Sequence, residues 1–212
     1  FVGGVITVEV NVTDNIEVEK VEFYIDEALL FTDTEAPWSC DFDTTEYGDG
    51  LHTLEVVAYD VAGNIASEAV AFYVDNTAPE VEIVVGDPSY YVNGTIFVNS
   101  STPITIAASD EGCGVQALFY RINSSWTQTL SQETVVSLSG SDGLYVLEVF
   151  AVDFLNNTAQ VVKIELYLDN TPPLVQAHFN EDVMVLELFA NDEGCGAAEV
   201  RYRIAGVTGW LL

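Results

Sequence analysis

Residues 51–64 read LHTLEVVAYDVAGN, and residues 144–157 read LYVLEVFAVDFLNN. The two stretches align at a constant offset of 93 residues, so that Leu54 corresponds to Leu147, and their apolar residues alternate with other residues. An alternation with period 2 is typical of a strand with one buried face. We therefore interpret this pair as the same antiparallel strand in two successive copies of one unit.

Two other blocks recur along the chain. A strand runs through Asp-Asn-Thr into proline in FYVDNTAPEVEI at 72–83 and in LYLDNTPPLVQA at 166–177. Three segments that start at Val8, Ile106 and Leu188 each join two strands through an acidic turn, and their alignment places Tyr24, Tyr120 and Tyr202 in register. Periods of about 80 to 96 residues, with some seven short strands in each, are typical of immunoglobulin-like β-sandwiches.

The same residues carry a family resemblance. Residues 36–64 resemble the second half of a bacterial Ig-like domain that occurs in strings on secreted and surface proteins. Residues 89–126, followed by 142–157 and 168–173, resemble a related Ig-like repeat, which usually has Ser-Gly where this chain has Cys-Gly. The resemblance implies tandem bacterial or archaeal Ig-like domains of a cell-surface or S-layer-like protein. Since this fold hosts many functions, it implies little about activity.

We predict an all-β fold of tandem Ig-like antiparallel β-sandwiches, with units at 1–76, 77–170 and 171–212. The first unit has no strand like PEVEIVV at 79–85, and the last ends after about three strands, so both are expected to be incomplete. A window from a longer array explains this; strand addition between neighbouring molecules, as in some pili, is the alternative. Proline-containing linkers should make the array a stiff rod.

The charge balance excludes several classes of partner. The chain has 34 acidic and 5 basic residues, a formal net charge of −29, and therefore repels nucleic acids and anionic membranes. Its hydrophobic fraction of 49% is too high for an acidic disordered tail. No apolar run is long enough for direct membrane insertion. Acidity and scarce lysine indicate an extracellular, cell-surface setting.

Five Asn-x-Ser/Thr sequons fit that setting. The predicted glycosylation sites are Asn11, Asn93, Asn99, Asn123 and Asn156.

The sequence shows no catalytic motif, since it has no G-x-S-x-G, H-E-x-x-H or P-loop pattern. His52 precedes a strand and is expected to pack or hold a turn. Cys40 is expected to be a buried, inert thiol. Cys113 and Cys195 occupy the same DEGCG turn in successive units, too far apart to form a disulfide, and are expected to be free or to pair outside the chain.

The three tryptophans admit two interpretations. They could form a stacking platform for sugars, or they could pack inside their own units. Packing is favoured because each tryptophan occupies a comparable place in its unit. The residues are Trp38, Trp126 and Trp210.

Acid-rich turns give the strongest site signal. In a sandwich of this kind, the loops after the second and sixth strands lie at the end that faces the preceding unit. Carboxylate and amide oxygens from these loops and the linker would meet there, and calcium binds about 6 to 8 such oxygens. We predict a calcium site whose ligands are Asp75, Asn76, Asp110, Glu111, Asp153 and Asn157, with a reduced version at the next junction from Asp169, Asn170, Asp192 and Glu193.

The alternative is that these side chains only cap turns through hydrogen bonds to the backbone. In the first unit, the counterparts of the predicted ligand loops are Asp14, Asp60 and Asn64, which would lie at the end that faces any preceding domain.

The function favoured by these observations is non-enzymatic: a structural segment of a cell-surface or S-layer-like protein, or an adhesin stalk. An accessory module of a large secreted hydrolase and a glycan-binding module are the alternatives. The expected partners are flanking Ig-like domains, other copies, or other surface proteins and glycans.

Overall fold

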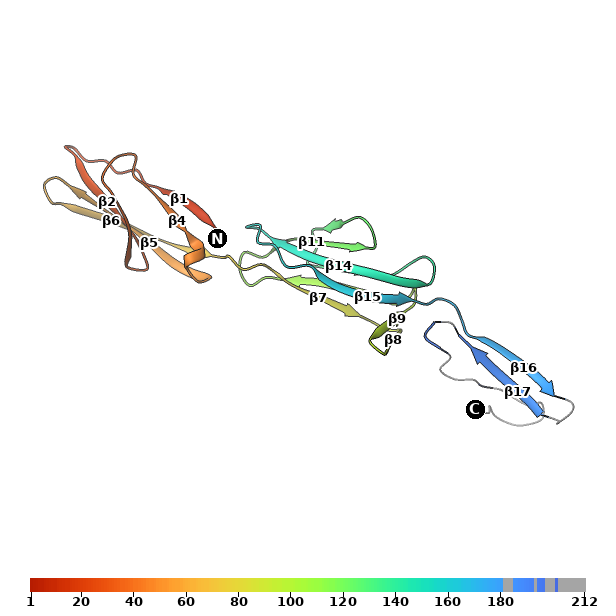
Figure 1. Ribbon diagram of the computed structural model, residues 1–212. Helices are drawn as coiled ribbons and strands as arrows, with labels where there is room; N and C mark the ends of the chain where they lie inside the picture. The colour runs from red at the N-terminus through yellow and green to blue at the C-terminus, as the bar shows by residue number, and fades with distance from the viewer. Residues whose placement is uncertain (181–184, 193, 197–200, 202–212) are drawn as a thin grey trace.

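The computed structural model describes residues 1–180, 185–192, 194–196 and 201 (Figure 1). This part of the chain consists of strands and one short 3-10 helix, which confirms the all-β prediction. Figure 1 shows two sandwiches and a two-stranded ribbon following one another along an extended path. The described residues include no helix with the length and apolar character of a membrane span.

The first sandwich packs a two-stranded sheet, in the order β1-β4, against a four-stranded sheet, in the order β3-β2-β5-β6. Its core contains Val21, Phe23, Trp38 and Cys40, so the prediction of a buried Cys40 thiol is confirmed. Its elements are β1 (Val5–Glu9), β2 (Val18–Ile25), β3 (Ala28–Asp33), β4 (Ser39–Asp43), the 3-10 helix η1 (Thr44–Glu46), β5 (Gly50–Asp60) and β6 (Ile65–Val74).

The second sandwich packs a three-stranded sheet, in the order β13-β10-β7, against a six-stranded sheet, in the order β12-β11-β14-β15-β9-β8. Leu147, Val149 and Ala151 of β14 are completely buried, as the alternation predicts for an inward face. Its strands are β7 (Glu80–Val85), β8 (Ser89–Val92), β9 (Thr95–Val98), β10 (Ile104–Ser109), β11 (Val115–Ile122), β12 (Thr127–Thr129), β13 (Glu133–Val136), β14 (Gly143–Asp153) and β15 (Val162–Leu168).

The pairing of strands corrects one predicted register. Tyr24 lies opposite Glu55, and Arg121 lies opposite Glu148, which is the counterpart of Glu55 at the offset of 93 residues. Tyr24 therefore corresponds to Arg121, and its predicted alignment with Tyr120 is wrong by one residue. The reason is that the DEGCG turn is one residue longer than the matching turn of the first sandwich.

The third unit is described as an antiparallel ribbon of β16 (Leu174–Asn180) and β17 (Val185–Asn191). Leu174 pairs with Asn191 there, as Glu80 of β7 pairs with Ser109 of β10. The ribbon thus repeats the first strand pair of the second sandwich. Tyr202, the third member of the predicted tyrosine register, lies outside the described residues.

Candidate functional site

The linker between the two sandwiches, residues 75–77, is held by the first sandwich through hydrogen bonds. Asn76 Oδ1 accepts from Gly4 N at 3.1 Å and from the Thr44 hydroxyl at 2.9 Å. Asp49 accepts from Asn76 N at 2.8 Å and from the Thr77 hydroxyl. The Asn76 oxygen therefore faces back into the first sandwich.

The next linker repeats these contacts. Asp142 accepts from Asn170 N at 2.9 Å and from the Thr171 hydroxyl, and Asn170 Oδ1 accepts from Ser100 N at 2.8 Å. We call this arrangement of one aspartate and the Asn-Thr of the linker the linker clamp. The same hydrogen bonds therefore accompany the Asp-Asn-Thr sequence at both junctions.

Asp75 links the first junction to the second sandwich. Its side chain is buried, with 1% of the residue exposed, and Oδ2 accepts from Cys113 N at 2.6 Å. A Cβ added at Gly112 would lie 2.2 Å from the Asp75 carboxylate, so only glycine leaves room for this approach. At the next junction, Asp169 accepts from Cys195 N at 2.8 Å, and Gly194 leaves the matching space.

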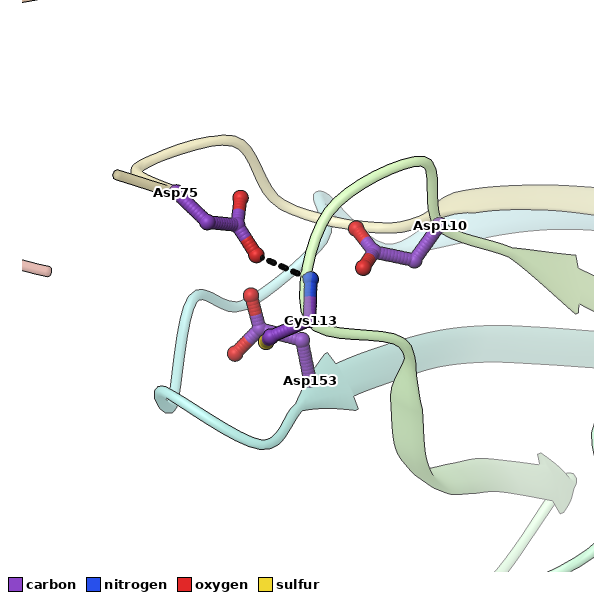
Figure 2. A group of neighbouring side chains, drawn as sticks. All are labelled: Asp75, Asp110, Cys113 and Asp153. Carbon is purple, nitrogen blue, oxygen red and sulfur yellow. Dashed lines mark hydrogen bonds between the residues drawn. The ribbon is translucent and has the colours of Figure 1, made fainter. Parts of the chain in front are cut away.

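Three carboxylates from three segments meet beside this contact (Figure 2). Asp75 comes from the linker, Asp110 from the turn after β10 and Asp153 from the end of β14. One ligand atom from each, together with the sulfur of Cys113, lies within 4.8 Å of the others. We call these four residues the junction cluster. The predicted convergence of the two loops and the linker is thus observed.

The other three predicted ligands of this site, Asn157, Glu111 and Asn76, are not members of the junction cluster. Asn157 adjoins the cluster, but its Nδ2 donates to Asp153 Oδ2 at 2.7 Å and to the Asp75 carbonyl at 3.2 Å. Glu111 is exposed and does not belong to the cluster. Asn76, which is held by the first sandwich, does not belong to it either. Cys113 was not predicted as a member, although its recurrence in both DEGCG turns was a usable signal.

Burial and hydrogen bonds set the protonation of the cluster. Burial alone would raise the pKa of Asp75, but hydrogen bonds from Cys113 and Thr77 outweigh it and lower that pKa. Burial, with a hydrogen bond to Asp75 and the charge of Asp153, raises the pKa of Cys113 to about 12. Cys113 is therefore a neutral thiol at pH 7, which makes it a poor nucleophile and a poor thiolate ligand.

At the second junction, the described residues show part of the same pattern. Asp169 contacts Cys195 as described above, and Asp192 Oδ1 accepts from Gly194 N at 2.8 Å, within its own turn. Asn170 belongs to the linker clamp. Glu193, the remaining predicted ligand, lies outside the described residues.

Turn capping accounts for many of the hydrogen bonds of these acids. Asp153 accepts from the backbone of Leu155 and Asn157 and from the Asn157 side chain. Asp60 accepts from Ala62 N, Asn64 N and Asn64 Nδ2 in the same way, although no described linker lies beside it. Asp14 likewise caps its own turn through Ile16 N and Glu17 N. These are the hydrogen bonds that the turn-capping alternative predicts, and they leave the choice between capping alone and calcium binding open.

His52 holds a turn, as predicted, through Asp26 Oδ2 at 2.6 Å and the Gly48 carbonyl at 2.8 Å. Trp38 packs in the first core, but Trp126 does not follow it. Trp126 is 39% exposed and contacts Phe150, and the Arg121 guanidinium lies 4.8 Å from the centre of its ring. Repeated packing inside the unit is thus wrong for Trp126, which is partly exposed with the Arg121 guanidinium over its ring. Trp210 lies outside the described residues.

The sequon asparagines lie at turns and on the surface. Four of the five are exposed, namely Asn11, Asn93, Asn123 and Asn156. Asn99 is half-buried, and its Oδ1 accepts from Ser101. Glycosylation of the four exposed residues stays a prediction.

Comparisons with known proteins find one family model and several solved structures that are similar to this chain. Residues 1–56 match the family model described as bacterial Ig domain. A search of curated protein sequences finds no match. Among solved structures, the fibronectin(III)-like modules of Clostridium thermocellum CbhA are 18% identical, with a TM-score of 0.40 over 78% of this chain and 86% of that one.

Two adhesin structures are also similar. A 1.5-MDa bacterial ice-binding adhesin is 18% identical, with a TM-score of 0.47 over 85% of this chain and 63% of that one. A Ca²⁺-stabilised adhesin of an Antarctic bacterium is 19% identical, with a TM-score of 0.39 over 85% of this chain and 48% of that one. The chain spans less than two thirds of the length of either adhesin structure. The observed sheets show tandem Ig-like β-sandwiches, and the part of the chain that matches the bacterial Ig domain model, residues 1–56, lies in the first of them.

Proposed function

We propose that this chain is a non-enzymatic, rod-forming segment of an extracellular cell-surface protein, such as an adhesin stalk or an S-layer-like array. The observation that carries the proposal is the linker clamp, because it recurs with the same donors and acceptors at both junctions. A linker whose Asn N–H, Asn side chain and Thr hydroxyl are held by the preceding sandwich would restrict the orientation of the next domain. A rod of this kind would hold a distal domain away from the cell.

The clamp can be tested by removing its two aspartates. In the Asp49→Ala, Asp142→Ala variant, each linker loses two hydrogen bonds and leaves an N–H donor unpaired, so we expect both junctions to bend. Small-angle scattering should show a shorter maximum dimension and a more flexible profile. The control is Glu19→Ala with Glu35→Ala, which removes two charges at exposed positions outside the clamp. Equal scattering profiles for the clamp variant and the control would contradict the proposed rigidity of the junctions.

The surface location has its own test, which is antibody labelling of intact cells that produce the protein. A failure of antibodies to label such cells would contradict it.

We further propose that the junction cluster binds calcium. Three carboxylates with ligand atoms within 4.8 Å repel one another, by an amount on the order of 3 kcal/mol per ionised pair at an effective dielectric constant of about 20. A divalent cation would remove this repulsion. A hollow of about 500 Å³, lined by Asp49, Asp110 and Glu111 among others, opens at the junction and admits water.

The residues present fit calcium in part. The carboxylates of Asp75, Asp110 and Asp153 supply the hard oxygen ligands that calcium prefers, and backbone carbonyls and water would have to complete a shell of about 6 to 8 oxygens. The neutral Cys113 thiol is not a ligand of that kind. It would instead keep its hydrogen bond to Asp75 and position that carboxylate.

Calcium binding should raise the melting temperature of the chain. A hundredfold excess over Kd would stabilise the folded state by about 2.7 kcal/mol. Asp110→Asn with Asp153→Asn should abolish this gain, whereas Asp110→Asn with Asp60→Asn should retain part of it. Asp60 caps its turn as Asp153 does, but it lies at the end of β5 opposite the junction, because Gly50 at the other end pairs with Val74. If the melting temperature is the same in EDTA and in millimolar calcium, the acids only cap turns and the clamp alone sets the junction.

A further inference from the structure

His52 lies between a carboxylate and a backbone carbonyl, and each of its two ring nitrogens faces an acceptor. Nδ1 lies 2.6 Å from Asp26 Oδ2, and Nε2 lies 2.8 Å from the carbonyl oxygen of Gly48. A neutral imidazole carries a single N–H, so only the protonated ring can donate to both atoms. The side chain is 14% exposed, which limits the access of water to either contact. The observed geometry is therefore that of a protonated histidine.

The carbonyl that His52 holds belongs to the turn that carries the first linker clamp. Gly48 directly precedes Asp49 in the chain. The Asp49 carboxylate in turn accepts from Asn76 N at 2.8 Å and from the Thr77 hydroxyl. A displacement of the Gly48 peptide group would therefore move the aspartate that holds the linker.

Loss of a proton from His52 removes one of its two hydrogen bonds. The remaining N–H is expected to stay with Asp26, because a hydrogen bond to a charged acceptor is stronger than one to a neutral carbonyl. The lone pair of Nε2 would then face the Gly48 carbonyl oxygen, and two acceptors at 2.8 Å repel one another. Deprotonation thus acts on the turn and not on the contact with Asp26.

The groups around His52 set the direction of the pH dependence. The hydrogen bond to Asp26, followed by that to the Gly48 carbonyl, raises the pKa of His52 above its ordinary value. Tyr47 meets the imidazole edge-on with ring centres 5.8 Å apart, and its own pKa is raised by burial, so it is uncharged at neutral pH. From β6, the ring of Phe72 adds no charge. The anchored turn is therefore complete below about pH 6.5, and the anchor is lost as the pH rises through the raised pKa of His52.

The second sandwich builds the same anchor from a different side chain. The counterpart of His52, at the offset of 93 residues, is Tyr145. Its hydroxyl donates to the carbonyl of Ser141 at 3.1 Å, and Ser141 directly precedes Asp142, the aspartate of the second linker clamp. A tyrosine hydroxyl does not change its charge between about pH 5 and 8, the range in which histidine does.

The partner of the histidine is replaced together with it. Asp26 caps β5 by accepting from Thr53 N at 2.9 Å, and Asn123 caps β14 in the same way by accepting from Val146 N at 2.7 Å. The first sandwich thus has an Asp-His pair where the second has an Asn-Tyr pair. Both members that carry charge in the first sandwich are uncharged side chains in the second.

We propose that the first linker clamp responds to pH, because protonated His52 anchors its turn and deprotonated His52 releases it, whereas the second clamp does not respond. The proposal rests on the proposed function, since it concerns the regulation of the clamp. The first junction would be stiff in mildly acidic surroundings and would bend more freely in alkaline ones, while the second junction would stay stiff in both.

The two clamps can be compared within one unmodified chain. The amide protons of Asn76 and Asn170 donate to the two clamp aspartates, so their exchange with water, measured by NMR and corrected for the intrinsic effect of pH, reports on each clamp. Between about pH 5.5 and pH 8.5, we expect the protection of Asn76 to fall by about threefold to tenfold. The midpoint should equal that of the His52 ring signals, and the protection of Asn170 should stay constant.

Exchanging the two pairs tests the cause. His52→Tyr with Asp26→Asn should make the protection of Asn76 independent of pH. Tyr145→His with Asn123→Asp should give Asn170 the dependence that Asn76 has in the unmodified chain. The control is His178→Tyr, which changes the other histidine of the chain at an exposed position of β16 and should leave the response of Asn76 as it is.

Two results in the unmodified chain would overturn the proposal. One is a constant protection of Asn76 between about pH 5.5 and pH 8.5, and the other is an equal fall at Asn76 and Asn170. Asp49→Ala separates this failure from a failure of the clamp. If this variant loses the protection of Asn76 at both pH values while the unmodified chain shows no pH dependence, the clamp stands and the response to pH is wrong. If it keeps that protection, the clamp is wrong as well.

Discussion

Replacing Leu147 with alanine should destabilise the second sandwich by about 3 to 4 kcal/mol, whereas Leu54→Ala should destabilise the first by only about half as much. The two leucines occupy the same position of their units, at the offset of 93 residues. Leu147 is completely buried, and its truncation leaves a cavity. Leu54 is half-buried and lines an open apolar groove of about 600 Å³ between the two sheets of the first sandwich, so that water already reaches part of its surface and less transfer free energy is lost.

Native-state hydrogen exchange, read separately on β11 and β14 and on β2 and β5, would measure both effects in one chain. The control is Leu144→Ala on β14, which is 57% exposed and should change stability by less than about 0.5 kcal/mol. Equal losses at Leu54 and Leu147 would mean that the groove is closed in solution.

The comparison of these two leucines also shows how far the sequence could predict the fold. Alternation and the repeat offset predict strands, inward faces and tandem sandwiches, because they depend on local pattern alone. The burial of Leu54 does not depend on its own pattern. It depends on whether a strand pairs with residues 8–13 as β7 pairs with β10 in the second sandwich, and that is a long-range contact.

The junction between the two sandwiches likewise combines a feature that the sequence predicts with features that depend on long-range contacts. Strand order predicted that Asp75, Asp110 and Asp153 would meet, since loops at one end of a sandwich must lie close together. The linker clamp could not be predicted in this way, because Asp49 lies 27 residues before Asn76, the residue whose N–H it accepts. The direction of the Asn76 oxygen is likewise set by Thr44 and Gly4 of the first sandwich, so its assignment as a metal ligand was not supported by the observed contacts.

Glycine at the DEGCG turn makes the closest contact of the junction, and Gly112→Ala should therefore have a large effect. The new Cβ would lie 2.2 Å from the Asp75 carboxylate. A side-chain end can often move aside, but Asp75 is 1% exposed and accepts from Cys113 N and Thr77 N, so its displacement breaks both hydrogen bonds and leaves a buried charge without them. We expect a loss of about 3 kcal/mol in the stability of the second sandwich.

Gly48→Ala is the matched control, because a Cβ added at Gly48 meets no atom within 4 Å. It should leave the melting temperature within about 2 °C of the unmodified chain. Adding Asp75→Ala to Gly112→Ala tests the cause directly, since the added methyl group then has no carboxylate to displace. If the clash is the cause, the double variant should lose no more stability than Asp75→Ala alone. The melting temperature and amide exchange at residues 113–118 would both measure this loss. If the stability losses of Gly112→Ala and Asp75→Ala add up in the double variant, the effect of Gly112→Ala arises in the backbone of the turn. It would then not arise from the contact between Gly112 and the Asp75 carboxylate.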